Sequence, residues 1–182
     1  IRYPEDLFKV QANVYNNYHM TDPRVFYNQE DLWNIPQESY GDVNINQNNM
    51  SAAAGSSISM QPYYALMSLP EAKQETFLLM LPFTPVEKNN LISWMAAKSD
   101  PGDYGELVLY KFPKQKLIYG PMQVEAKIDQ DSEISKQLSL WNQRGSEVIR
   151  GNLLTIPLGK SILYVEPIFL QAEQSQLPEL KR

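Results

Sequence analysis

Two apolar runs near the C-terminus have the clearest hydrophobic pattern in the chain. Residues 147–157 and 161–170 are rich in Ile, Leu and Val, a composition that favours half-buried β-strands. Gly159 and Lys160 stand between them, and a leading Gly is typical of the type II′ turns that join hairpin strands. The pattern predicts a β-hairpin, around which we expect a sheet to be built.

Apolar residues spaced by three and four positions predict helices elsewhere. Pro4, Glu5 and Asp6 are typical of a helix N-terminus. The spacing that follows predicts an amphipathic helix to about Tyr18, and its expected buried face consists of Leu7, Val10, Val14 and Tyr18. A second, short helix is predicted within residues 24–34.

The C-terminal half contains two further helical patterns before the hairpin. Gly120 and Pro121 open a predicted helix that runs to about Asp129. Another begins near Asp131, and its expected buried residues are Ile134, Leu138 and Trp141.

The middle of the chain combines strand patterns with one helix-start motif. Residues 62–69, 75–83 and 106–112 are predicted to be strands. The segment from Thr84 to Glu87 matches a capping box with Pro at the first helical position. It predicts a helix to about Lys98, whose apolar face is formed by Leu91, Ile92, Met95 and Ala96.

A segment rich in Asn, Gln and Ser interrupts these patterns. Residues 38–60 offer few apolar side chains to bury, so we expect a flexible loop or insertion there. The whole of 1–182 is then expected to be a single soluble α+β domain. Its sheet of about five strands, antiparallel or mixed, is covered by helices and preceded by an N-terminal helical segment.

Composition and charge exclude several classes of function. The net charge is −5 and no Lys/Arg cluster forms a basic stripe, so nucleic acid is not an expected partner. The absence of cysteine excludes disulfides, thiolate catalysis and Cys-ligated metals. No apolar run approaches the roughly 18 residues needed to span a bilayer, so this piece is not expected to insert directly. Because it starts at Ile1 without an initiator Met, we expect it to be a fragment of a longer protein.

His19 is the only histidine and therefore the first candidate for acid–base chemistry. One interpretation is a general base oriented by Asp22. The other, which we favour, is a cation at a helix C-terminus or a packed ring bonded to a free carbonyl.

Two groups of carboxylates have spacings that could suit a cation. Asp100, Asp103 and Glu106 lie in a Gly-containing loop, as calcium ligands can. A second group lies between the two C-terminal helices, where capping by Asp131 and a favourable charge at Glu133 explain the pattern. Neither group matches the EF-hand loop, and the common nucleotide-binding and hydrolase motifs are absent. We assign no catalytic, cofactor-binding or metal residue.

The remaining candidates are aromatic and basic residues. Trp33, Trp94 and Trp141 have apolar neighbours and are expected in the core. Arg144 and Arg150 flank the entry to the hairpin and could grip a carboxylate or phosphate, although a structural ion pair is the simpler use.

Several ordered peptides together resemble one known family. They are Tyr3-Pro4-Glu5-Asp6-Leu7-Phe8, Tyr18-His19-Met20-Thr21-Asp22-Pro23, Leu81-Pro82-Phe83-Thr84-Pro85, Phe112-Pro113-Lys114-Gln115-Lys116, Trp141-Asn142-Gln143-Arg144-Gly145-Ser146, Ile149-Arg150-Gly151-Asn152 and Tyr164-Val165-Glu166-Pro167. The chain resembles part of the soluble C-terminal region of uncharacterised protein family 0182, large bacterial multi-pass membrane proteins of unknown function. The resemblance implies a parent in the plasma membrane and an extracytoplasmic position for this piece. It brings no catalytic residues.

Three functional hypotheses follow. The leading one is a non-catalytic interaction or scaffold domain, whose partner is the membrane-embedded part of the parent chain or another envelope protein. The alternative is a carboxylate-based hydrolase or carbohydrate-binding domain of the cell envelope. The third is a module stabilised by calcium at Asp100, Asp103 and Glu106.

Overall fold

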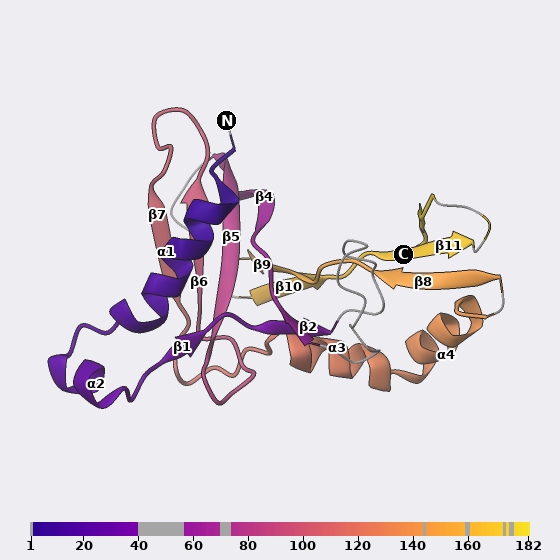
Figure 1. The fold of residues 1–182 in the computed structure, drawn as a ribbon, viewed down its shortest axis with the longest axis horizontal. Helices are drawn as coiled ribbons and strands as arrows, with labels where there is room; N and C mark the ends of the chain where they lie inside the picture. The colour runs from indigo at the N-terminus through magenta and orange to yellow at the C-terminus, as the bar shows by residue number, and fades with distance from the viewer. Residues whose placement is uncertain are drawn as a thin grey trace. The chain divides into compact units, whose positions relative to one another are not determined.

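The computed structural model describes residues 2–39, 57–69, 74–143, 145–158, 161–172, 174 and 177–182 (Figure 1). They divide into two compact units. The first comprises Ile1–Pro36, Met60–Gly120 and Leu158–Ile162, and the second comprises Gln37–Ser59, Pro121–Pro157 and Leu163–Arg182. Both units combine helices with antiparallel strands, which confirms the α+β class. The single-domain organisation stays a prediction.

The first unit is built on a five-stranded antiparallel sheet. Its longest strand, β5 (Glu75–Pro85), pairs on one side with β6 (Ser93–Lys98), which in turn pairs with β7 (Leu107–Lys111). Two strands share the other side of β5. These are β4 (Tyr63–Ser68), opposite residues 75–80, and β1 (Trp33–Asn34), opposite residues 84–85.

The core of this unit lies along β5 and β6. Every residue from Leu78 to Thr84 and from Ser93 to Ala97 is buried, so both faces of these strands are covered. Pro82 falls between the β4 and β1 pairings, where β5 has a ladder partner only in β6. A proline is tolerated there because its missing N–H leaves no ladder bond unmade on the β1–β4 side.

The helix predicted from the Thr84 capping box is wrong. Thr84 belongs to β5 and pairs with Asn34, and residues 93–98 form β6. Leu91, Met95 and Ala96 are apolar because β6 and its approach are buried on both faces. A strand buried on both faces loses the alternating pattern and can imitate a helical one.

The N-terminal helix is confirmed, but its predicted buried face is wrong. Helix α1 (Glu5–Tyr18) packs against β1 and β5 through the buried residues Phe8 and Ala12. The second helix, α2 (Pro23–Asn28), is shorter than expected, and Trp33 lies in β1 instead. The Asp22 side chain caps α2 by accepting a hydrogen bond from Arg24 N at 2.8 Å.

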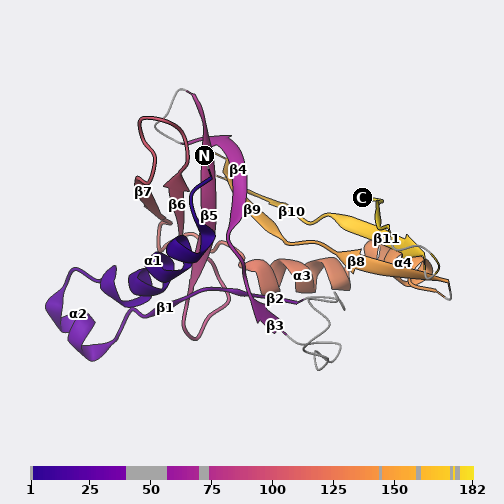
Figure 2. The same cartoon turned by 45° about the horizontal axis from the view of Figure 1, so that its top comes forward.

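The second unit contains the two other predicted helices, α3 (Pro121–Gln130) and α4 (Ser132–Trp141). Gly120 precedes α3 at a point where a Cβ would lie 1.9 Å from the carbonyl oxygen of Asn89, so only glycine fits. Helix α4 packs against β8 (Ser146–Arg150), which Figure 2 shows beside it.

The predicted hairpin exists but is interrupted. Its outer part pairs β8 with β11 (Ile168–Ala172), and its inner part pairs β9 (Leu154–Leu158) with β10 (Ser161–Val165). The interruption lies at Gly151, whose N–H donates to the carbonyl of Pro167 at 2.8 Å. A Cβ on Gly151 would lie 2.6 Å from the Pro167 ring, so the two chains approach closely there. A short strand β12 (Glu179–Leu180) also pairs with β11.

The ends of the predicted flexible loop are strands. β2 (Gln37–Ser39) pairs antiparallel with β3 (Ser57–Ser59). Residues 40–56, where most of the loop was predicted, lie outside the described residues, as do Arg144 and the predicted turn at Gly159 and Lys160. Among the helices that the structure describes, none is both long and apolar enough to cross a membrane.

Candidate functional site

Helix α1 carries a second apolar face that the first unit leaves exposed. Leu7, Val10, Val14 and Tyr18, which we call the outer stripe, have exposed fractions of 47%, 61%, 48% and 69%. Their spacing of 3, 4 and 4 residues places them on one side of the helix, because an α-helix turns about 100° per residue. Phe8 and Ala12 occupy the other apolar side.

The outer stripe continues onto α2. The rings of Tyr18 and Phe26 lie 5.6 Å apart, and Phe26 is itself exposed. Tyr27 is 88% exposed. Single exposed apolar residues are common, whereas a contiguous apolar row along a helix is typical of an interaction surface.

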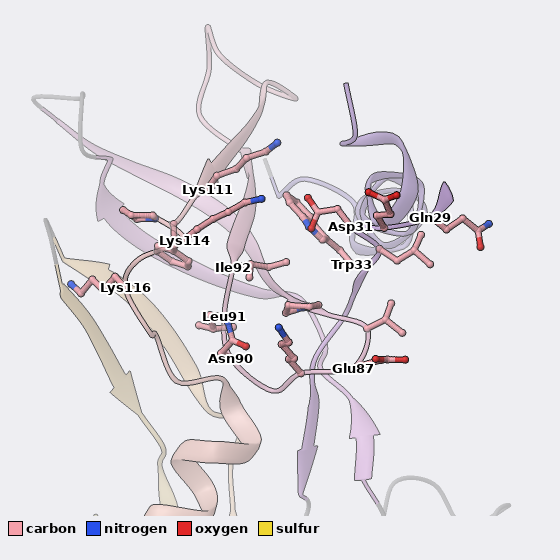
Figure 3. Close-up of a pocket in the computed structure, with 17 residues that line it drawn as sticks. Gln29, Asp31, Trp33, Glu87, Asn90, Leu91, Ile92, Lys111, Lys114 and Lys116 are labelled. Atoms are coloured by element: carbon pink, nitrogen blue, oxygen red, sulfur yellow. The ribbon is translucent and has the colours of Figure 1, made fainter. Parts of the chain in front are cut away.

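A hollow of about 810 Å³ lies at one end of the same sheet (Figure 3). It is lined by the turn before β1, the turn after β5 and the segment that follows β7. Four lysines line it: Lys88, Lys111, Lys114 and Lys116. Three of them lie within six positions of the sequence, which is the one local signal of this feature. Lys88 belongs to a turn more than twenty positions earlier in the chain.

His19 is a packed ring and not a general base oriented by Asp22. Its Nδ1 donates to the carbonyl oxygen of Tyr15 at 2.8 Å, and its ring stacks on Trp33 with centroids 3.5 Å apart. The carboxylate near it is Asp31, with Oδ2 at 3.7 Å from Nε2. Asp22 caps α2 instead. The favoured interpretation of His19 is confirmed, and the one with Asp22 is wrong.

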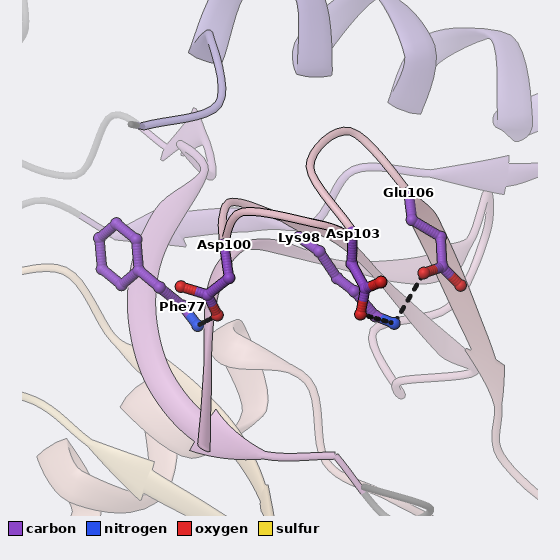
Figure 4. Close-up of polar contacts among 5 residues, drawn as sticks. All are labelled: Phe77, Lys98, Asp100, Asp103 and Glu106. Carbon is purple, nitrogen blue, oxygen red and sulfur yellow. Dashed lines mark hydrogen bonds and ion pairs between the residues drawn. The ribbon is translucent and has the colours of Figure 1, made fainter. Parts of the chain in front are cut away.

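The carboxylates considered for calcium have partners within the protein (Figure 4). Asp100 Oδ2 accepts from the N–H of Phe77 at 2.8 Å. Lys98 Nζ lies 3.3 Å from Asp103 and 2.7 Å from Glu106. The hydrogen bond that Lys98 donates to Glu106 is the main cause of the raised pKa of Lys98. Across the described parts of the chain, no three His, Asp or Glu side chains are grouped as a metal site.

Arg150 is the centre of an ion-pair network in the second unit, as the structural interpretation expected. Its guanidinium lies 3.0 Å from Asp129 Oδ1 and 2.9 Å from Glu166 Oε1. Burial raises the pKa of Glu166 to about 7, Arg150 acts in the opposite direction, and Glu125 and Asp129 add to the increase. A carboxyl group with a raised pKa is a feature of glycosidases. Here, however, the Glu166 side chain is only 5% exposed, and Glu125 is buried as well.

Two of the three tryptophans that were predicted to lie in the core are buried. Trp33 and Trp94 are buried, which confirms them as core residues, whereas Trp141 is only half-buried at the end of α4. Asp131 caps α4 by accepting from the N–H groups of Glu133 and Ile134, each at 3.0 Å. The second carboxylate group therefore contributes to helix capping, as predicted.

These observations define an α+β protein with an exposed apolar helix face and a lysine-lined hollow. The chain belongs to the uncharacterised protein family UPF0182, whose profile matches residues 1–141. Relatives named UPF0182 protein include one from Trichodesmium erythraeum, 58% identical over 181 residues. Others are from Desulforamulus reducens, 55% identical over 182 residues, and Methanospirillum hungatei, 52% identical over 183 residues.

The match covers all of this chain but only part of each relative. The three relatives are aligned over 100% of the chain and over 18%, 18% and 19% of their own lengths. The chain therefore spans less than a fifth of the proteins that it resembles. No solved structure matches it.

Proposed function

We propose that this chain is a non-catalytic interaction domain that docks onto another segment of its longer family protein through the outer stripe of α1. The observation that carries the proposal is the row of exposed apolar residues opposite to the buried face of the helix. A spacing of three and four residues suits packing into the side-chain grooves of another helix. We therefore infer that the occupant is an apolar helix.

The length of the relatives supports an occupant within the same polypeptide. More than four-fifths of each of these relatives lies outside the segment aligned to this chain. An intramolecular partner is present at high effective concentration, so the modest apolar area of the outer stripe is enough to bind it. Tyr18 and Phe26 would lie at the end of this interface, where aromatic side chains contribute large contact areas.

We further propose that the longer protein resides in the plasma membrane and that this domain lies on its extracytoplasmic side. The support is the resemblance set out from the sequence. A membrane-embedded helix whose end projects from the bilayer on the extracytoplasmic side could dock onto the outer stripe, so it fits both the docking and the location. Another envelope protein is the alternative partner.

The test uses single cysteines in the longer protein, in a background without other cysteines. The chain itself has none. Val14→Cys places a thiol in the outer stripe, and Asn13→Cys places one at an exposed position on a different side of the same helix. We expect a maleimide reagent to label position 13 readily and position 14 at least about tenfold more slowly, because docking buries it.

The same variants test the partner and the location. Equal labelling at both positions in the longer protein would disprove docking through the stripe. Slow labelling of Val14→Cys that persists after proteolytic release of the domain would also count against an intramolecular partner. A membrane-impermeant maleimide should label Asn13→Cys in intact cells, and labelling only after permeabilisation would reject the extracytoplasmic position.

A further inference from the structure

The hollow in the first unit has the size and lining of a small-molecule site. Its volume of about 810 Å³ falls within the roughly 300–1,000 Å³ of typical ligand pockets. Its apolar wall includes Trp33, Leu91, Ile92 and Phe112. Two backbone hydrogen bonds fix this wall: Phe112 N donates to Ile92 O, and Leu91 N donates to Ile118 O, each at 2.8 Å.

Three lysines of the hollow, Lys88, Lys111 and Lys114, form no direct ion pair with the described carboxylates around them. Within the described ranges, no carboxylate lies within 4 Å of the ammonium groups of Lys88, Lys111 or Lys114. Figure 3 shows Lys111 and Lys114 extending towards the side where Trp33 lies, whereas Lys116 points away from it. The ammonium of Lys111 lies 5.4 Å from the centre of the Trp33 ring.

The acidic residues of the hollow have other neighbours. Glu30 accepts a hydrogen bond from Asn28 Nδ2 at 2.9 Å, and Asp31 lies 3.7 Å from His19 Nε2. Glu87 is directed away from Lys111 and Lys114 in Figure 3. By contrast, Lys98 on β6 is held by two carboxylates. The ammonium groups of Lys88, Lys111 and Lys114 are thus not held in a direct ion pair with the described carboxylates and can contact an anionic ligand.

Trp33 supplies a second indication of a ligand. Its ring is fixed by stacking on His19, and it is 5% exposed. Trp33 lines the hollow, and its buried indole Nε1–H has no hydrogen-bond partner among the residues that the structure describes. Because buried donors are nearly always paired, an acceptor is expected to reach it.

We propose that this hollow binds a small organic anion with an apolar body. A carboxylate or phosphate group lies among Lys88, Lys111 and Lys114, and the apolar body covers the accessible parts of Val86, Ile92 and Phe112. Lysine is a compact, freely rotating cation that suits either anionic group. The site is independent of the docking surface on α1, so either proposal can fail without the other.

Calorimetric titration of the purified longer protein tests this site. The probes are phenyl phosphate, benzoate and short-chain phosphatidylglycerol, and benzylamine serves as a cationic control of similar shape. We expect at least one anion to bind with an affinity that falls as salt is raised, and benzylamine not to bind. Binding of phosphatidylglycerol alone would identify a lipid headgroup as the ligand, whereas binding of phenyl phosphate or benzoate would identify a soluble anion.

Charge variants assign the binding to the hollow. Lys111→Gln combined with Lys114→Gln should lower the affinity at least about tenfold, and Lys111→Arg combined with Lys114→Arg should retain most of it. Lys136→Gln, at an exposed position on α4, is the matched control and should change nothing. The proposal is overturned if no anion binds, if benzylamine binds equally well, or if the double Gln variant folds and binds as tightly as the control.

Discussion

Single side chains at helix starts illustrate how far local chemistry determines structure. Asp131 was expected to cap a helix, and it accepts two backbone hydrogen bonds there. Thr84 was expected to do the same, yet it is buried in β5. The motif around Thr84 is equally well formed locally, but burying the apolar residues of β5 and β6 against each other outweighs a cap worth about 1 kcal/mol.

Replacing Asp131 with Ala should destabilise the second unit by about 1 kcal/mol, because two N–H groups at the start of α4 lose their acceptor. Asp131→Asn keeps a side-chain oxygen and should cost less. Urea denaturation of the 182-residue chain, followed by circular dichroism, measures both. An Ala variant as stable as the Asn variant would show that the cap does not contribute.

At the scale of elements, α1 has two apolar faces, one buried within the first unit and one exposed. Phe8 and Ala12 are fully buried against the sheet of the first unit, while the outer stripe remains exposed. The spacing in the sequence identified an apolar row correctly but assigned it to the core. Periodicity shows which residues share a side of a helix, and it does not show what covers that side.

Truncating the two faces of α1 should therefore have different effects. Phe8→Ala should cost about 3–5 kcal/mol in the 182-residue chain, because it empties a fully buried site. Val10→Ala, at a position 61% exposed, should change the free energy of unfolding by no more than about 0.5 kcal/mol. Equal losses measured by urea denaturation would mean that the outer stripe is also packed within this chain.

At the scale of the whole molecule, the buried network around Arg150 links folding to pH. The guanidinium of Arg150 forms ion pairs with both Asp129 and Glu166. The negative charge of Glu125 raises the pKa of Glu166. Desolvation of Glu166 is the largest contribution to its pKa of about 7. Such a group takes up a proton on folding at mildly acidic pH.

Stability should accordingly fall as the pH rises between about 4.5 and 7, the ordinary and the folded pKa of Glu166. In this window the folded chain binds more protons than the unfolded chain, and above it the contribution levels off. Glu166→Gln mimics the protonated form and should remove this contribution. Urea denaturation at several pH values gives the free energy of unfolding of the unchanged chain and of Glu166→Gln. The two free energies should diverge as the pH rises towards 7, and a constant difference between them would contradict the raised pKa of Glu166.

Much of the secondary structure follows from the sequence, because caps, prolines and periodicity act within a few residues. They gave α1, α3, α4, the strands β4, β5 and β7, and the hairpin. The hollow could not be predicted, because Lys88 and Lys114 line the same hollow only as a result of the pairing of β5, β6 and β7. Nor could the outer stripe be told from a core face.

The tertiary structure decided the identity of β6 and the exposed face of α1. Residues 94–97 carry apolar side chains on both faces because they lie between β5 and β7 in a covered sheet, and no local signal distinguishes this from a helix. The side of α1 that is buried depends on the direction from which β1 and β5 approach it. Local free energies of about 1 kcal/mol select turns and caps, whereas long-range burial of whole strands selects among the folds that they permit.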